Sequence, residues 1–399
     1  MVQPQGFAHA SQSHLVYKLN KALYGLEIAP EAWFSTFSTF LLSQNFVPSQ
    51  CDSSLFVLKT PTSITILLIY DILLTGSDPL YIAYLIQQIH ATFSMKELGF
   101  VNYFLGISVT KTFVGYVLSQ QKYASKILAK AGMNDCKSYS SPMAIKVSTL
   151  SFDADLPLSQ PSIYRSLVGA LQYLTITRPN LASVVNHVCQ FMQALLNSHF
   201  ASVKRLLRYI KGILGRGLHF SSGSLILNAY SDSDWAKNVL DRRSTTGYCA
   251  YLGLNLISWS AKKQPTVSRS SSEAEYRALA HASIELSWLG MLLAERHCPV
   301  PVPTLWCDNL SAIAMSHNPV FHARTIHIEV DYHFVRERIA AKKLHICYIP
   351  TTDQITDIFT KPLSVARFQY LQSKLLVLPS PMSLRGNDKR TAPEQAAPT

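Results

Sequence analysis

An acidic residue stands at each of four predicted element ends in the second half of this 399-residue chain. From residue 225 onward the pattern predicts strands first and then alternating helices and strands, an order typical of an α/β layer with a mixed sheet. The acids are Asp232, Glu275, Asp308 and Asp357. The carboxyl ends of neighbouring strands meet at one edge of such a sheet, where α/β proteins hold ligands. We therefore expect these four carboxylates to converge on one site.

Carboxylates that converge in this way predict a site for divalent cations. Acidic residues are scarce, 24 against 36 Lys and Arg, so four in one place are informative. Carboxylates alone repel a phosphodiester, whereas carboxylates that hold two divalent cations attract it and stabilise the attacking and leaving oxygens. The net charge of +12 indicates a polyanionic partner, either nucleic acid or an acidic membrane surface, although mildly basic globular proteins are common.

The predicted helix over residues 271–295 contains two neighbouring acids, and their positions on it predict different roles. Ser270 and Glu273 fit a capping box, which gives Glu273 a structural role. Glu275 instead begins an apolar stripe at helical spacing. The stripe continues through Leu279, Ala282, Leu286, Leu289 and Leu293. A charge on that face is costly to bury unless something pairs with it, and a metal ion would do so. Glu275 is therefore the functional candidate.

The residues alone leave the other acids open. Asp308 precedes a helix, and an N-cap role would by itself explain an Asp there. Asp232 and Asp234 follow the same strand and share a face, so spacing barely separates them. Asp353 fits a cap of the last short helix, and Asp357 lies one turn further on the same face.

A basic stripe precedes this region. The predicted helix over residues 199–211 places Lys204, Arg208 and Lys211 at i, i+4 and i+7, on one face. The stripe is either a nucleic-acid-binding surface or an ordinary solvated face.

Several protein classes are disfavoured. The seven cysteines contain no CxxC pair, which argues against a disulfide framework or zinc site and favours a reducing compartment. The first residues do not resemble a signal peptide, and the longest apolar run, residues 64–74, is too short to span a bilayer. We expect an intracellular protein of the cytoplasm or nucleus, not secreted, without a membrane partner or small-molecule cofactor. The oligomeric state stays open.

Six segments resemble one known family. They are residues 230–236 (YSDSDWA), 241–248 (DRRSTTGY), 271–279 (SSEAEYRAL), 307–309 (CDN), 327–337 (HIEVDYHFVRE) and 353–362 (DQITDIFTKP). They are similar to the ribonuclease H domain of copia-type LTR retrotransposon Pol polyproteins. The resemblance implies that Asp232, Glu275, Asp308 and Asp357 are the catalytic, metal-binding carboxylates. It also implies two Mg²⁺ ions, for which Mn²⁺ can substitute, and an RNA–DNA hybrid as partner.

The resemblance continues upstream into a reverse transcriptase. Residues 21–26 (KALYGL), 95–99 (MKELG), 103–107 (YFLGI) and 164–174 (YRSLVGALQYL) resemble its later segments. The family's Tyr-x-Asp-Asp motif is shortened by two residues to Tyr70-Asp71, a residual polymerase motif. The first catalytic Asp motif should lie upstream of residues 3–7 (QPQGF). Polymerase catalysis needs paired aspartates for two metals, so we expect that activity to be lost. We also expect the shortened hairpin to be distorted, with little or no turn.

These inferences together predict the organisation of the chain. We expect a truncated reverse-transcriptase palm (1–143), a linker and helical thumb or connection (144–222), a ribonuclease H-like domain (223–378) and a disordered tail (379–399). The fold class is α/β: a ribonuclease H-like mixed sheet with flanking helices, preceded by an α+β palm remnant. The predicted function is two-metal ribonuclease H cleavage by a Pol remnant without polymerase activity. The alternative is a catalytically inactive nucleic-acid-binding relic.

Overall fold

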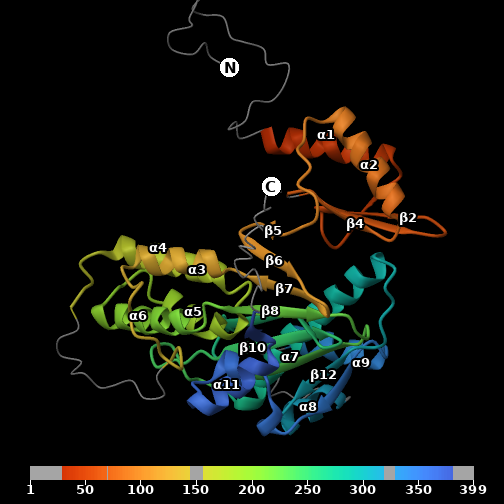
Figure 1. Cartoon of the computed structure of the whole chain (residues 1–399). Helices are drawn as coiled ribbons and strands as arrows, with labels where there is room; N and C mark the ends of the chain where they lie inside the picture. The colour runs from red at the N-terminus through yellow and green to blue at the C-terminus, as the bar shows by residue number, and fades with distance from the viewer. Residues whose placement is uncertain (1–28, 70, 144–155, 319–328, 381–399) are drawn as a thin grey trace, which may run out of the picture. The chain divides into compact units, whose positions relative to one another are not determined.

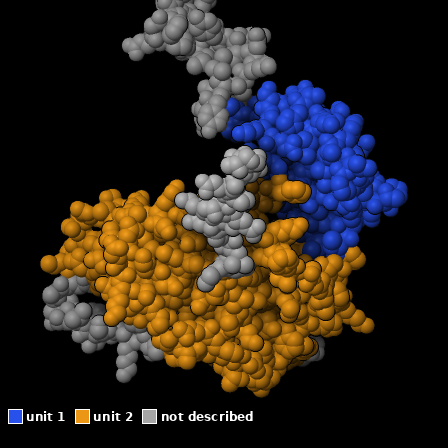
Figure 2. Space-filling model, in the orientation of Figure 1, with its two compact units in different colours: residues 1–99, 291–298 blue, residues 100–290, 299–399 orange. Residues whose placement is uncertain are grey.

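The computed structural model describes residues 29–69, 71–143, 156–318 and 329–380, and over these residues the chain is a mixed α/β protein (Figure 1). The chain packs into two compact units. The first contains residues 1–99 and 291–298, and the second contains residues 100–290 and 299–399 (Figure 2). The predicted four-part division follows sequence motifs rather than packing and stays a prediction.

The first unit contains an antiparallel meander covered by two helices. Its strands lie in the order β1-β2-β3-β4, and Phe37, Phe56 and Leu85 are among the residues of its core. The elements are α1 (Ala29–Ser43), β1 (Val47–Pro48), β2 (Leu55–Lys59), β3 (Ile64–Leu68), β4 (Leu73–Gly76) and α2 (Pro79–Thr92). Helix α2 begins where the Asp78 carboxylate accepts hydrogen bonds from two backbone N–H groups.

The hairpin of β3 and β4 is regular, so the predicted distortion is wrong. Leu68 pairs with Leu73 in an antiparallel register that continues to Thr65 and Gly76. Residues 69–72 separate the two strands, and residue 70 among them lies outside the described residues. The shortened motif therefore still leaves enough chain to turn.

An antiparallel sheet in the second unit joins distant parts of the chain. Its order is β14-β8-β7-β6-β5. The strands are β5 (Tyr103–Phe104), β6 (Ile107–Lys111), β7 (Gly115–Ser119), β8 (Arg216–Ser221) and β14 (Val377–Pro379). Because β8 pairs with both β7 and β14, it links the segment before the helices to the last described strand.

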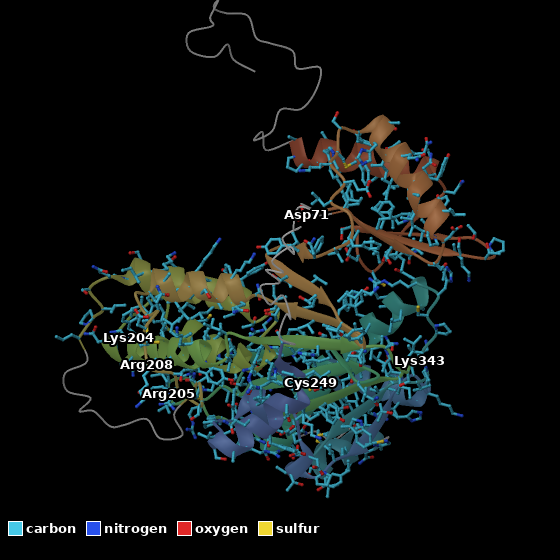
Figure 3. The ribbon with its side chains drawn as sticks, viewed as in Figure 1. Asp71, Lys204, Arg205, Arg208, Cys249 and Lys343 are labelled. Atoms are coloured by element: carbon cyan, nitrogen blue, oxygen red, sulfur yellow. The ribbon has the colours of Figure 1, made fainter. Side chains whose placement is uncertain are left out.

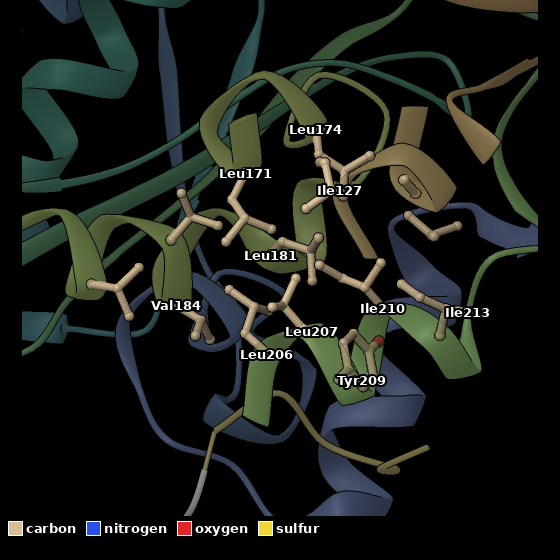
Figure 4. Packing of buried hydrophobic residues seen from close by; sticks show 14 of the residues in the cluster. Ile127, Leu171, Leu174, Leu181, Val184, Leu206, Leu207, Tyr209, Ile210 and Ile213 are labelled. Carbon is tan, nitrogen blue, oxygen red and sulfur yellow. The ribbon is translucent and has the colours of Figure 1, made fainter. Parts of the chain in front are cut away.

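A layer of helices shares its core with the mixed sheet that positions the site. The helices are α3 (Gln121–Lys130), α4 (Pro161–Leu174), the 3-10 turn η2 (Pro179–Leu181), α5 (Ala182–Cys189) and α6 (Asn197–Gly212). Their buried side chains, among them Leu171, Leu206 and Ile210, form one cluster (Figure 4). The same cluster includes Cys249 and Phe359, so the helices pack against that sheet.

The sheet that positions the site is mixed, as predicted. Its order is β11-β10-β9-β12-β13, where β9, β10 and β11 are antiparallel and β12 runs parallel to both β9 and β13. The strands are β9 (Leu227–Ser233), β10 (Thr245–Leu252), β11 (Asn255–Lys263), β12 (Thr304–Cys307) and β13 (His345–Tyr348). Gly253 turns the β10–β11 hairpin with a φ of +60°, which favours glycine. The predicted α/β fold class is confirmed.

Helices cover both faces of this mixed sheet. One face packs against α7 (Ser271–Glu295), whose Tyr276, Leu279 and Leu286 join Leu305 of β12 in a second cluster. The remaining helices are α8 (Leu310–His317), α9 (Glu329–Ala340), α10 (Asp357–Thr360) and α11 (Val365–Lys374). Across the described ranges, we find no helix both long enough and apolar enough to cross a membrane.

Candidate metal centre

Asp232 lies near the end of β9 and is fully buried. Both of its carboxylate oxygens have protein partners. Oδ1 is 2.9 Å from Nζ of Lys361, and Oδ2 accepts a hydrogen bond from the hydroxyl of Thr360. The charge of this buried carboxylate is therefore compensated within the protein.

Asp357 begins α10 and shares the same lysine. Its Oδ1 is 2.7 Å from Lys361 Nζ, and its Oδ2 is 3.2 Å from a guanidinium nitrogen of Arg367. Asp357 and Lys361 are four residues apart, the spacing that brings side chains together on a helix. Lys361 thus bridges two of the four predicted carboxylates. Burial opposes its charge, but the two carboxylates outweigh that effect and raise the pKa of Lys361.

Glu275 lies in the first turn of α7 and differs from both aspartates. It is only 7% exposed, and within the described residues its Oε2 has no hydrogen-bond partner. Burial raises the pKa of Glu275 well above its usual range, and the nearby charges of Asp232 and Asp308 raise it further. A buried carboxylate without a cation is costly. Glu275 is therefore the member of the set that most needs a cation.

Asp308 follows β12 and has only neutral hydrogen-bond donors. The hydroxyl of Thr351 lies 2.9 Å from Oδ2, and Nε2 of Gln354 lies 3.3 Å from Oδ1. The N-cap of α8 is Asn309, whose side chain accepts from the Ala312 backbone. Capping therefore does not explain Asp308.

The two neighbouring acids that share faces with the candidates are engaged elsewhere. Asp234 exchanges hydrogen bonds with the Thr245 backbone, which fixes the end of the β9–β10 pair. Burial raises the pKa of Asp234 to about 6. Asp353 is exposed and belongs to the 3-10 turn η4 (Thr351–Asp353). Neither residue pairs with Lys361.

The four predicted carboxylates meet in one place. Lys361 joins Asp357 to Asp232, and Glu275 is close enough to both Asp232 and Asp308 to feel their charges. Possible ligand atoms of Glu275, Cys307 and Asp308 lie within 4.8 Å of one another. Burial raises the pKa of Cys307, and the other two residues offer carboxylate oxygens. Hard oxygen donors suit Mg²⁺ or Mn²⁺, and the unpartnered Glu275 oxygen fits such an ion.

Sequence reasoning did not select Lys361, Thr360 or Arg367. A signal existed for Lys361, because it lies four residues after Asp357, immediately after the end of the helix predicted over residues 353–360. Thr360 and Arg367 gave no comparable signal, since their contacts depend on how α10 and α11 pack.

The residual polymerase motif is not part of an acidic cluster. Asp71 lies exposed in the connection between β3 and β4 (Figure 3), and Tyr70 lies outside the described residues. Over the described ranges, the candidate metal-binding cluster is that of Glu275, Cys307 and Asp308, which does not include Asp71.

The predicted basic stripe on α6 is partly engaged in packing. Lys204 is exposed and lies over the Phe200 ring. Arg208 donates a 2.8 Å hydrogen bond to the Tyr139 hydroxyl, and Arg205, which was not predicted, lies over the same ring. Figure 3 labels Lys204, Arg205 and Arg208 on α6. Lys211 is half-buried. Within the described residues, none of these four cations forms a salt bridge with an acid.

Comparison with known proteins places the chain in a family. Residues 1–145 match the family model of reverse transcriptase (RNA-dependent DNA polymerase). The chain is 42% identical over 390 residues to the retrovirus-related Pol polyprotein from transposon RE2 of Arabidopsis thaliana, over 97% of this chain and 27% of that protein. It is 35% identical to the corresponding polyprotein from transposon TNT 1-94 of Nicotiana tabacum, over 92% of this chain and 29% of that protein.

This chain belongs to the Pol polyproteins of copia-type retrotransposons. It spans about a quarter of the length of these polyproteins. It is also 53% identical over 225 residues to the uncharacterized mitochondrial protein AtMg00810 of Arabidopsis thaliana, over 56% of this chain and 93% of that protein.

Solved structures of ribonucleases H give weaker matches. The LC11 ribonuclease H1 isolated from compost is 15% identical, with a TM-score of 0.28, over 34% of this chain and 93% of that one. The ribonuclease H1 of Halobacterium salinarum is 14% identical, with a TM-score of 0.24, over 33% of this chain and 89% of that one.

Proposed function

We propose that this Pol-family chain is a metal-dependent nuclease that cleaves the RNA strand of RNA–DNA hybrids. The observation that carries the proposal is the convergence of Asp232, Glu275, Asp308 and Asp357 at the edge of the mixed sheet. A protein that needed these residues only for folding would pair each of them. The unpartnered, buried oxygen of Glu275 instead favours a role in holding a cation.

The chain's own residues have distinct roles in this proposal. Glu275 and Asp308 hold Mg²⁺ or Mn²⁺, with Asp232 beside them. Thr351 and Gln354 orient the Asp308 carboxylate through neutral hydrogen bonds, so its full negative charge stays available. A cation held by these residues would supply the positive charge that attracts the scissile phosphodiester and offsets the charge on its oxygens.

The basic residues of α6 bind the hybrid backbone in this proposal. Lys204 is the most accessible of them, and Arg205 and Arg208 stack together on Tyr139. A guanidinium held by an aromatic ring keeps its charge and needs little further ordering to contact a phosphate. Because no acid of the described residues neutralises these cations, they remain available to a polyanion.

We further propose that the chain does not polymerise DNA. Asp71 is exposed and is not a member of the cluster of Glu275, Cys307 and Asp308 found among the described residues. Polymerase chemistry requires several carboxylates that hold two metal ions together.

A second candidate is a module that binds hybrids without cleaving them. One observation favours it: all four oxygens of Asp232 and Asp357 already have protein partners. A cleavage assay separates the two functions. The full chain is incubated with a hybrid labelled on the RNA strand, in Mg²⁺, in Mn²⁺ and in a chelator. We expect RNA fragments only with a divalent cation. Tight hybrid binding without fragments in either metal would favour the binding module.

A further inference from the structure

The candidate metal centre is divided into two unlike halves. In one half, the carboxylates of Asp232 and Asp357 accept hydrogen bonds. The donors are Lys361, Arg367 and the Thr360 hydroxyl. In the other half, Glu275 has an unpartnered oxygen and Asp308 has only the neutral donors described above. The protein therefore satisfies one half itself and leaves the other to an external cation.

We propose that Lys361 is a resident cation that takes the place of one of the two divalent ions. This inference rests on the proposed metal site and refines it. In the free protein the Lys361 ammonium occupies the half between Asp232 and Asp357. The site then takes one divalent cation readily, at the half that contains Glu275 and Asp308. It takes a second one only when Lys361 leaves.

The charges of the site support this division. Lys361 and Arg367 contribute two positive charges against the four carboxylates. When all four carboxylates are ionised, a net charge of two negative units remains, which one divalent cation would balance. A second divalent cation would have to enter a half that is already neutral. It would meet the Lys361 ammonium there at close range, and like charges in a poorly solvated site repel strongly.

The position of Lys361 allows it to leave without unfolding the site. It follows the last residue of α10 and precedes Pro362, so the helix does not continue beyond it. Its backbone N–H remains bonded to the Asp357 carbonyl at 2.9 Å, which anchors the main chain while the side chain moves. The side chain is 35% exposed, so a path to water exists. Asp232, only 1% exposed, has no such freedom.

Counting bound Mn²⁺ on the full chain tests the proposal. Lys361→Met keeps much of the side chain's length and apolar contact but removes the charge. Lys237→Met is the matched control. Lys237 is an exposed lysine nearby, and its ammonium contacts the Thr360 carbonyl at 3.3 Å and forms no ion pair with Asp232 or Asp357. Calorimetric titration should give one strongly bound Mn²⁺ for the wild type and for Lys237→Met, and two for Lys361→Met. We expect the second ion to bind about tenfold tighter in Lys361→Met, equivalent to about 1.4 kcal/mol.

Thermal unfolding gives a second measurement that needs no activity. Without metal, Lys361→Met should unfold at a lower temperature than the wild type, because Asp232 then lacks its cation. Mn²⁺ should stabilise this variant more than it stabilises the wild type. If the variant folds only when Mn²⁺ is added, the proposal is supported, because a divalent ion then replaces the ammonium. A variant that stays unfolded in saturating Mn²⁺ would contradict it.

Equal Mn²⁺ stoichiometry and affinity in the wild type and Lys361→Met would overturn the proposal. A second ion that appears equally in Lys237→Met would also overturn it, because the effect would then come from general charge. These results are independent of hybrid cleavage. Cleavage with an unchanged ion count would refute only the resident cation, whereas a changed count without cleavage would refute only the nuclease function.

Discussion

Glu273 and Glu275 lie two residues apart in the first turn of α7, but their surroundings are opposite. Glu273 accepts a 2.9 Å salt bridge from Arg277 and a 2.8 Å hydrogen bond from the Arg269 backbone. Glu275, which is equally buried, has an oxygen without a partner. Two positions along one helix therefore separate an acid that stabilises the fold from an acid that is available to a cation.

Asp308→Asn should abolish metal-dependent hybrid cleavage without unfolding the protein. The amide can still use the Thr351 and Gln354 contacts in part, but it no longer supplies the charge that holds a cation. Cleavage and far-ultraviolet circular dichroism are measured on the same preparation. Asp353→Asn is the matched control, because Asp353 is an exposed acid nearby that should tolerate the change. Undiminished cleavage by Asp308→Asn would remove this residue from the site.

Glu275→Gln should make the metal-free protein more stable at neutral pH while it removes cation binding. The folded pKa of Glu275 is raised by burial and by Asp232 and Asp308, so the folded state holds this proton more tightly than the unfolded state. The Glu275 contribution to the free energy of unfolding therefore falls as the pH rises above the unfolded value. The amide avoids this cost, and we expect a gain of about 1–3 kcal/mol, the usual penalty for an unsatisfied buried group.

Chemical denaturation at several pH values in a chelator measures this effect. The difference between Glu275→Gln and the wild type should be small below pH 4.5, where the unfolded carboxyl is protonated, and should grow toward neutral pH. A variant that is less stable than the wild type at every pH would show that the Glu275 carboxylate has a structural partner.

Glu273→Gln should cost stability and spare cleavage. Its backbone N–H donates to the Ser270 hydroxyl as predicted, and its side chain accepts from the Arg269 backbone, one residue before Ser270. The loss of this cap and of the Arg277 charge pair should lower the free energy of unfolding by about 1 kcal/mol. Denaturant titration measures that loss. A fall in cleavage equal to that of Glu275→Gln would show that the roles of the two acids are assigned wrongly.

The order of elements and the location of the site could be predicted because each depends on local patterns. The apolar stripe that Glu275 begins and the capping box at Ser270 can both be recognised within residues 270–295 of the sequence. Asp308 was ambiguous because a sequence cannot show that the next residue, Asn309, provides the cap. The partners of Asp232 were missed because they come from residues almost 130 positions away, and only the packing of α10 brings them together.

The purified chain should not extend a primer on an RNA or a DNA template. Asp71 lies exposed between β3 and β4 and does not belong to the described metal-ligand cluster, so it cannot hold two ions alone. Primer extension with Mg²⁺ or Mn²⁺ is followed on a sequencing gel beside an active reverse transcriptase. Extended products that depend on this chain would show that its polymerase site is complete.

Hybrid binding should depend steeply on salt, and the α6 cations should account for part of the slope. Each phosphate contact releases counterions and contributes about 0.7 to 0.9 to the slope of log affinity against log salt. Replacing Lys204, Arg208 and Lys211 by Ala should therefore flatten the slope by about two to three units. Arg208 also stacks on Tyr139, so its removal is expected to lower stability as well.

Single variants distinguish binding by the α6 cations from an effect of the net charge of the chain. Lys204→Ala removes an exposed cation of α6, and Lys343→Ala removes an exposed cation that lies on a distant part of the same unit (Figure 3). Binding is measured by fluorescence anisotropy across a salt series. We expect Lys204→Ala to reduce the slope by about one unit and Lys343→Ala to leave it unchanged. Equal effects of the two variants would mean that the hybrid responds to the net charge of +12, and that α6 is a solvated face.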